Sequence, residues 1–525
     1  MRFKKIILFI LGLSSPLFAA QNKQIQLEIQ QLQVQAKAMQ AQLAKLQKKL
    51  QVQNSKSHPP EKKTPIKKAA QSTASIHEVP AYETFHSTQL TVHTPEAHPE
   101  SICFYPTALV ADDRVVTYIA GTPVVTSPYL GDRPAFDGSD YIVNISSINR
   151  DIRLMQQRRR LYRAYMDIGY PAPQMPILAL SGKSEPNAMV NSHYNGNISG
   201  DLTLGSSELD VAAALNQNVE AYIALAYDES PPSVGPRINN SAFNLNMGFV
   251  NIGNLDKTPF YFTAGQLFVP FGRYASSMIS APLTLNLART KTRPFILGYK
   301  SQEDPGPFAA IYGYRSDTTL GKAGVGGVNL GYIFKYGVNS GEIGASYISS
   351  LADAAGMQST GSKGTTFGGF GSITNGNEFI RKTPAFDVHA NFGYGPFNFA
   401  AEWVGVTQAF RAEDLSYNGQ GAKPQAGQAE INTTFTLFDR PSSLGAAYQW
   451  TNQALALNLS KQRLSAVFNI SIWKDTIESL EYRHDIDYNT YQFASGAAPF
   501  GQTNSNTYGT GQASNSILAQ IGVYF

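Results

Sequence analysis

The amino-acid sequence is poor in cysteine and in charge. Cys103 has no second cysteine to pair with, which excludes a disulfide within the chain. After the first twenty residues, no apolar run approaches the roughly 18 residues that a membrane-spanning helix needs. Charged residues make up 15% of the 525 residues, whereas aromatic residues make up 11% and glycine occurs 44 times. This composition disfavours both a helical membrane protein and an array of soluble domains.

The sequence also lacks the motifs of common enzymes. It has no Gly-rich phosphate loop, and Cys103 has no partner at the spacing of a zinc site. A hydrolase would need a histidine beside a nucleophile, and residues 190–525 hold only His193, His389 and His484. We interpret these as ordinary wall or rim residues. The sequence therefore predicts no enzyme and no protein-bound cofactor.

The N-terminus carries an export signal. Arg2, Lys4 and Lys5 precede an apolar stretch, and small residues follow at Ala19 and Ala20. This is the pattern of a secretory signal peptide over residues 1–20, because the apolar stretch is too short for a membrane anchor. The mature protein is therefore expected to leave the cytoplasm of a Gram-negative cell.

Positive charge is concentrated at the N-terminus. Residues 21–70 hold ten lysines and two acidic residues, whereas residues 71–525 hold 29 basic and 36 acidic ones. A nucleic-acid-binding protein would carry its basic charge on a folded face. We therefore expect no nucleic-acid partner.

Two different segments follow the signal peptide. Residues 21–53 place apolar side chains at a 4–3 spacing through four heptads, as in Ile25, Ile29 and Leu32, which predicts a coiled coil rather than a disordered Gln-rich segment. Its apolar stripe implies a partner, most simply a second copy of the chain. Residues 54–100 are rich in Pro, Lys, Ser and His. They predict a flexible polar linker, because the histidine spacings fit no structural zinc site.

Residues 101–189 form an intermediate region with one amphipathic helix. Arg150, Arg153, Arg160 and Arg163 fall on one face of a helix near 147–166. These guanidinium groups are candidates for binding the carboxylates of a substrate, if the helix lies in or under a barrel lumen as a partial plug. The alternative is a helix packed on the periplasmic rim, with its arginines in solvent.

From residue 190 the sequence alternates with period two. Leu209 and Val211 alternate with Glu208 and Asp210, and a turn follows at 216–218. Similar runs begin at 386, 397 and 464. Export, aromatic residues along the apolar faces and long polar loops between tight turns favour an antiparallel all-β transmembrane barrel in the outer membrane. About sixteen strands fit residues 190–525, and the coiled coil would lie in the periplasm.

The last strand carries the pattern of an assembly signal. Apolar side chains alternate up to the C-terminus. They are Ile517, Ala519, Ile521, Val523 and Phe525. Such a strand closes a barrel against the first strand, and it resembles the signal that the outer-membrane assembly machinery reads. That machinery and the outer-membrane lipid are therefore expected partners.

Charged residues on the alternate face predict the lining of the lumen. The candidates for contacting substrate are Asp387, His389, Glu402, Glu481, Arg483 and Asp485. Glu208, Asp210 and Glu220 share this face. Most of these are acidic, whereas a porin for phosphate or other anions would be expected to line its pore with Lys and Arg.

Two stretches resemble the LbtU-like, legiobactin receptor-type family of siderophore porins. They read YLGDRPAFDGSDYIVNISSINRDIRLMQQRR (129–159) and NLDKTPFYFTAGQLFVPFGRY (254–274). The resemblance implies uptake of a ferric siderophore through an outer-membrane barrel, with the iron held by the siderophore. Transport would be independent of TonB, because residues 101–189 are too short for the plug of a TonB-dependent receptor. The alternatives are a trimeric general diffusion porin and a structural barrel that anchors the envelope.

Overall fold

The computed structural model describes eleven stretches of the chain. They are residues 115–119, 122–126, 149–167, 175–228, 242–302, 305–316, 324–336, 339–359, 380–473, 476–496 and 507–524. The predicted signal peptide, coiled coil and linker lie outside these residues, as does Phe525. Among the described residues, no helix is long and apolar enough to cross a membrane.

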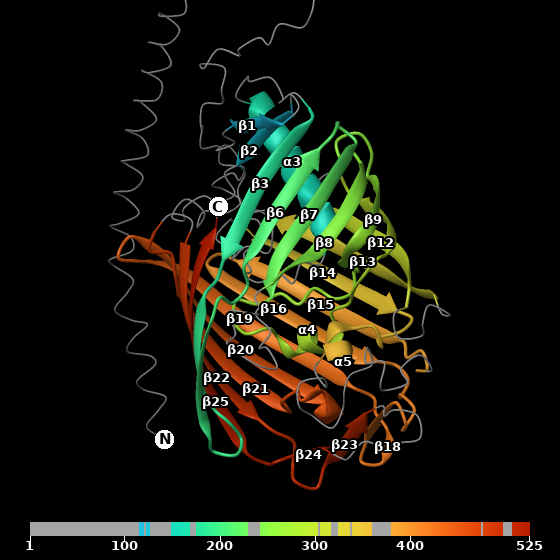
Figure 1. Ribbon diagram of the computed structural model, residues 1–525, viewed down its shortest axis with the longest axis vertical. Coiled ribbons are helices and arrows are strands. Elements are labelled where there is room, and N and C mark those ends of the chain that lie inside the picture. Colours follow the sequence, from blue (N-terminus) through green and yellow to red (C-terminus); the bar gives the residue numbers. More distant parts are fainter. Residues whose placement is uncertain are drawn as a thin grey trace, which may run out of the picture. The chain divides into compact units, whose positions relative to one another are not determined.

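Sixteen antiparallel strands form a closed barrel (Figure 1). β3 (Ile177–Ser184) and β4 (Asn187–Ser192) together make the first strand, and β5 (Ile198–Thr203) and β6 (Glu208–Ala214) make the second. The other strands are β7 (Val219–Asp228), β8 (Ala242–Gly253), β9 (Phe260–Phe268), β11 (Phe295–Lys300), β12 (Gly306–Arg315), β13 (Gly324–Tyr336), β14 (Asn339–Ile348), β15 (Ala385–Tyr394), β16 (Phe397–Val406), β19 (Gln425–Leu437), β20 (Arg440–Asn452), β21 (Gln462–Ile470), β22 (Thr476–Ile486) and β25 (Ala513–Tyr524). The predicted barrel and strand number are therefore confirmed.

The last strand closes the barrel against the first. β25 pairs antiparallel with β4 and then with β3, where Val523 lies opposite Ser184. On its other side β25 pairs with β22. The first barrel strand begins at Ile177, before the boundary at residue 190 that the alternation predicts. That start is hard to read from sequence, because the face of β3 alternates less clearly than those of later strands.

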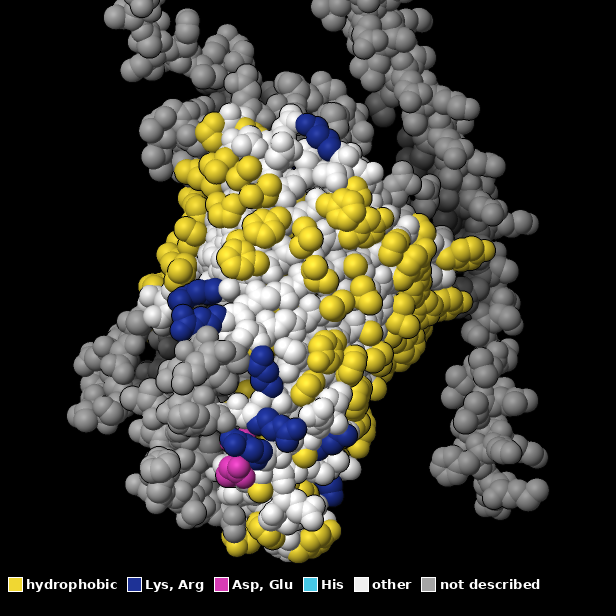
Figure 2. Space-filling view, turned by 90° about the vertical axis from the view of Figure 1, so that its right-hand side faces the viewer, with side chains coloured by type: hydrophobic (Ala, Val, Ile, Leu, Met, Phe, Trp, Pro, Cys, Tyr) yellow, Lys and Arg dark blue, Asp and Glu magenta, His cyan; other side chains and the backbone are white. Residues whose placement is uncertain are grey.

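Period-two alternation separates an apolar outer wall from a polar inner one. In β15, Phe386 and Val388 are 45% and 49% exposed, whereas Asp387 and His389 between them are buried. Figure 2 shows the consequence on one face: apolar side chains cover much of the upper and right-hand wall, and Lys and Arg gather toward its lower part. Such a wall suits contact with lipid.

The two ends of the barrel differ. At the turn end, short turns such as 215–218, 395–396 and 438–439 join the strands. Phe438 and Asp439 both have positive φ, as a two-residue hairpin turn requires. At the loop end the connections are long. They carry α5 (Ala355–Ser359), η6 (Leu455–Leu457) and a small sheet of β17 (Leu415–Tyr417), β18 (Gln420–Gly421), β23 (Phe493–Gly496) and β24 (Thr507–Tyr508).

Two segments lie against the inner wall. The first is α3 (Arg150–Asp167), preceded by the hairpin of β1 (Val115–Ile119) and β2 (Thr122–Thr126), which pairs parallel with β3. The second is the connection from β9 to β11, which contains α4 (Leu283–Ala288) and β10 (Lys291–Thr292). We call this connection, residues 269–294, the inward loop.

Candidate functional site: the constriction of the lumen

The inward loop begins where β9 can no longer continue. Pro270 removes a backbone donor, and Gly272 and Tyr274 have φ of 78° and 52°. A Cβ on Gly272 would lie 2.2 Å from the ring of Tyr274, so any other residue there would have to displace that ring. The chain therefore leaves the sheet and turns toward the inner wall, where the Gly272 N–H donates to Ser346 Oγ of β14 at 2.9 Å.

Glu402 is the first strong anchor of the inward loop. Its carboxylate on β16 accepts the backbone N–H groups of Arg273 at 2.6 Å and Tyr274 at 3.0 Å. Thr284 Oγ1 and Gln428 Nε2 donate to the same carboxylate at 3.1 and 3.2 Å. Hydrogen bonds to a charged group contribute about 1.5–3 kcal/mol each. This one side chain therefore holds both the start of the loop, at Arg273 and Tyr274, and α4, at Thr284.

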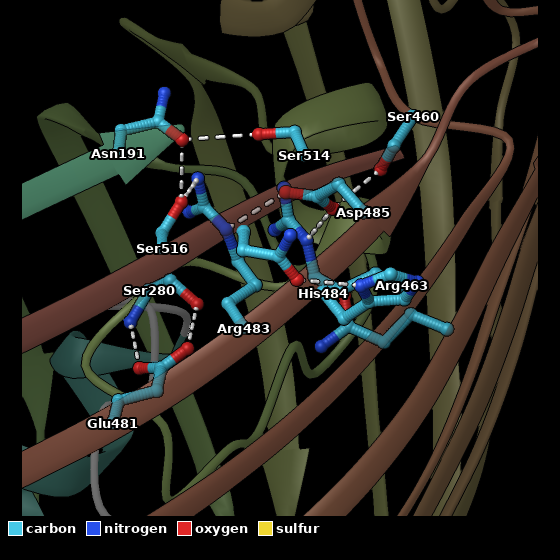
Figure 3. A network of polar contacts seen from close by, with 12 residues as sticks. Asn191, Ser280, Ser460, Arg463, Glu481, Arg483, His484, Asp485, Ser514 and Ser516 are labelled. Carbon is cyan, nitrogen blue, oxygen red and sulfur yellow. Dashed lines mark hydrogen bonds and ion pairs between the residues drawn. The ribbon is translucent and has the colours of Figure 1, made fainter. Parts of the chain in front are cut away.

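Two further carboxylates continue this row of anchors. Glu430 on β19 accepts the N–H of Ser277 at 2.6 Å and the hydroxyls of Ser276 and Ser277. Glu481 on β22 accepts the N–H of Ser280 at 2.8 Å and its hydroxyl, as Figure 3 shows. The loop therefore crosses the inner face of β14, β16, β19 and β22 as a tethered constriction.

α3 is held on a different part of the wall. Arg150 is 1% exposed, and its Nη1 donates to Glu208 Oε1 at 2.8 Å and to Tyr222 Oη at 2.5 Å. The Tyr222 hydroxyl in turn donates to Asp210 at 2.6 Å. Arg158 forms an ion pair with Glu220 at 3.0 Å. The helix therefore lies against the inner face of β6 and β7.

The second residue of α3 also points into this wall. Thr263 Oγ1 of β9 donates to Asp151 Oδ2 at 3.0 Å, and Asn251 Nδ2 of β8 donates to the Asp151 carbonyl at 3.1 Å. Burial raises the pKa of the Asp151 carboxyl above its usual range, although the hydrogen bonds from Thr263 and the Ile152 N–H oppose this. Towards the turn end, Arg159 Nη1 donates to the Gln302 carbonyl at 2.9 Å.

The arginines predicted to bind substrate have separate surroundings. Arg150 is taken up by Glu208 and Tyr222, and Arg153 is half-buried on the same helix. Arg160 and Arg163 belong to α3, but their side chains lie outside the described part of the structure. The expectation that Arg150 offers its guanidinium group to a substrate is thus wrong, because Glu208 and Tyr222 of the wall bind that group.

Asp485 joins two arginines on the inner face (Figure 3). Arg463 Nε lies 2.7 Å from Asp485 Oδ1, and Arg483 Nε lies 2.8 Å from Oδ2. Arg463 Nη1 also donates to the Ala281 carbonyl of the inward loop at 3.2 Å, and Arg483 Nη2 donates to Ser516 Oγ at 3.2 Å. We did not single out Arg463 from the sequence, although its place opposite Asp485 on β21 follows once the register is known.

Asp387, His389 and Glu402 come together on β15 and β16. One ligand-type atom from each lies within 4.8 Å of the others, a spacing that suits a divalent metal ion. His389 Nδ1 lies 2.8 Å from Asp387, and its Nε2 lies 3.4 Å from Glu342, which also faces Arg273 at 3.4 Å. Glu402 already accepts hydrogen bonds from the inward loop, so these three residues lie directly beneath that loop.

The inward loop ends in cations that the sequence analysis missed. Arg289 and Lys291 lie over the ring of Phe268, at 4.5 and 5.8 Å from its centroid. Lys291 Nζ donates to Asn246 Oδ1 at 3.0 Å, and Asn246 donates to the inward-facing Glu208 at 3.2 Å. The signal was present in the sequence, where Arg289, Lys291 and Arg293 alternate with threonines.

His193 sits between a serine and an amide near the β4–β5 turn. Its Nε2 lies 2.7 Å from Ser199 Oγ, and its Nδ1 lies 3.0 Å from Asn191 Nδ2. Asn191 Oδ1 is taken by Ser514 and Ser516, so the amide donates to Nδ1.

The described residues of the predicted assembly signal lie on the outer face of β25. Ile517, Ile521 and Val523 are 53%, 50% and 40% exposed, and Ala519 is exposed between them. Their side chains point toward the surroundings of the barrel and away from the lumen.

The chain is similar to proteins of its own length. No protein-family model matches it. A UPF0422 protein of Legionella pneumophila strain Paris is 67% identical over 537 residues, which cover 100% of both chains. A UPF0422 protein of Legionella pneumophila strain Philadelphia 1 is 67% identical over 539 residues, again with 100% of both covered. A UPF0422 protein of Coxiella burnetii is 36% identical over 404 residues, which cover 76% of this chain and 83% of that protein.

Similar solved structures are distant in sequence. An anion-selective porin from Comamonas acidovorans has a TM-score of 0.41 at 12% identity, covering 66% of this chain and 99% of that one. The outer membrane channel DcaP of Acinetobacter baumannii has a TM-score of 0.42 at 13% identity, covering 66% and 97%. Similarity at this level assigns no activity to the chain.

Proposed function

The chain belongs to the UPF0422 protein family, and we propose that it is a diffusion channel of the outer membrane, through which small hydrophilic solutes pass without an energy source. The tethered inward loop is the observation that supports this most strongly. A barrel of sixteen strands is wide enough for an aqueous interior. A loop fixed across that interior narrows the pore and so limits the size of the solutes that pass, without any change in the number or pairing of the strands.

The outer wall supports placement in a lipid bilayer. Apolar side chains alternate outward along the strands, and a soluble barrel would not expose Phe386, Val388 and Leu480 at 45%, 49% and 53%. Aromatic residues such as Trp403 and Tyr482 also face outward, in keeping with contact at a membrane interface. In this proposal the turn end faces the periplasm, as the short turns of outer-membrane barrels do.

Conductance in planar lipid bilayers tests the channel. Purified full-length protein, shown to be folded by its heat-modifiable migration in gel electrophoresis, is expected to give discrete ohmic current steps in KCl. The single variants Glu430→Gln and Glu481→Gln weaken one anchor each and are expected to give larger or noisier steps. A folded protein that gives no current would overturn the proposal.

Ferric siderophore uptake is a second candidate function. The stretches that resemble the siderophore porins, 129–159 and 254–274, include the start of α3 and the start of the inward loop. These are the elements that lie in the lumen, where a transported complex would make contact. The iron would remain within the siderophore as cargo, and passage would be independent of TonB.

Uptake of radiolabelled iron separates the two candidates. Iron-starved cells with and without the protein receive one purified ferric siderophore at a time. Saturable uptake that depends on the protein supports the siderophore function. Unchanged iron uptake, together with slower entry of unrelated small solutes when the protein is missing, leaves only the diffusion channel.

A further inference from the structure

Carboxylates and cations occupy different depths of the described inner wall. The inward-facing carboxylates Asp210, Asp387 and Glu481 are fully buried, and Glu208, Glu402 and Glu430 are at most 8% exposed. By contrast, Lys291 is exposed, Arg289 is half-buried, and the side chain of Arg483 keeps 17% of its surface. Most of the inward carboxylates therefore lie behind the loop or the helix, and Asp201 and Glu342 are half-buried.

The buried carboxylates are covered by donors. Backbone N–H groups of the inward loop cover Glu402, Glu430 and Glu481, and Arg150 covers Glu208. These donors place positive partial charge between each carboxylate and the lumen. Coulomb attraction falls with distance, and salt screens it over about 8–10 Å. The nearest charges therefore dominate what a hydrated ion experiences.

Two inward carboxylates keep more surface: Asp201 of β5 is half-buried, and Glu342 of β14 keeps 17% of its side-chain surface. Glu342 faces Arg273 at 3.4 Å and His389 at 3.4 Å, so its charge is locally offset. At the end of the loop, Arg289 and Lys291 share the ring of Phe268, which brings two cations together at one edge of the constriction. The local balance at the loop end of the constriction is thus positive.

We infer that the channel selects small anions over cations, with the basic pair Arg289 and Lys291 as the selectivity-determining residues. The solutes of choice would be small carboxylates and phosphates. The inference rests on the proposed channel function and adds the class of solute to it. It also reverses the sequence expectation, in which an acidic inner face argued against an anion channel.

Counting the inward-facing charges in the sequence argued against an anion channel, and there is a physical reason why that count misleads. Period-two alternation indicates which carboxylates face inward, but not which of them a loop more than a hundred residues away will cover. Once Glu402, Glu430 and Glu481 are engaged as anchors, their number says little about the surface that a solute meets. The short RTKTR run at 289–293 contributes the exposed charge instead.

Reversal potentials across a KCl gradient test the inference on the full-length protein. We expect chloride to be preferred over potassium by about twofold or more in the wild type. Lys291→Glu is expected to bring the ratio to about one or below. The matched variant Lys257→Glu makes the same charge change on the exposed turn after β8, and it should leave the ratio unchanged. Potassium phosphate in place of KCl should preserve the preference for the anion.

The outcomes separate the two proposals. Current steps with no preference, or with a preference for potassium, overturn anion selectivity and leave the channel standing. Absence of current in folded wild-type protein overturns the channel itself. Equal loss of selectivity in Lys257→Glu and Lys291→Glu would show that net charge, and not the basic pair, sets the preference. If Lys291→Glu fails to fold, the wild-type ratio and an Arg289→Gln variant still decide the question.

Discussion

The two halves of the lumen wall use the same acidic residue types in different ways. Along β14–β22, carboxylates such as Glu402 and Glu430 accept backbone N–H and hydroxyl groups of the inward loop. Along β6 and β7, Glu208 and Glu220 instead pair with guanidinium groups of α3. A carboxylate that accepts neutral donors can hold irregular backbone in place, because each N–H of a loop needs an acceptor.

The difference predicts which element is more sensitive to the loss of one residue. The loop is held by several carboxylates on separate strands, so losing one leaves the others. At the N-terminus of α3, Arg150 supplies the ion pairs with the buried carboxylates Glu208 and Asp210, beside the neutral hydrogen bonds that Asp151 accepts from Thr263. Removing one member of a buried ion pair leaves an uncompensated charge, which costs more than removing a neutral hydrogen bond.

The largest effect is expected from Arg150→Met. Without the guanidinium, Glu208 and Asp210 lose their nearest cation, at a cost of about 3–5 kcal/mol. We expect α3 to leave the wall, which raises both trypsin cleavage at its arginines and single-channel conductance in an otherwise folded barrel. Arg150→Lys, the matched control, keeps the charge and should lose less. Unchanged protease protection in Arg150→Met would contradict this account of helix docking.

A smaller effect is expected from Glu402→Gln. The amide retains one acceptor oxygen, but it loses the charge that strengthens the bonds from Arg273 and Tyr274. A loss of about 1.5–3 kcal/mol in loop anchoring follows. Noise in the open-channel current should rise while the temperature at which the barrel unfolds in gel electrophoresis stays nearly the same. A clear fall in that temperature would show that this anchor also supports the barrel.

The period-two alternation of the sequence predicts most of the barrel fold but little of the constriction inside it. The hairpin of β15 and β16, with its turn at Gly395 and Pro396, follows from period two and turn residues alone. The contact of Glu430 with Ser277 joins residues 153 positions apart. No local pattern encodes which loop will reach which carboxylate, so an anchor and a substrate ligand look the same in the sequence.

The turn at Gly272 is the part of the constriction that the local sequence does encode. Changing it is expected to have the smallest effect. Gly272 and Gly395 both have positive φ, at 78° and 55°. A Cβ at Gly395 would meet nothing within 4 Å, whereas one at Gly272 would lie 2.2 Å from the Tyr274 ring. Both alanine variants therefore pay backbone strain of about 1 kcal/mol, but only Gly272→Ala must also displace Tyr274. We expect altered conductance in Gly272→Ala and unchanged conductance in Gly395→Ala, with both barrels folded. Equal conductance in the two variants would mean that the turn at Gly272 does not set the path of the inward loop.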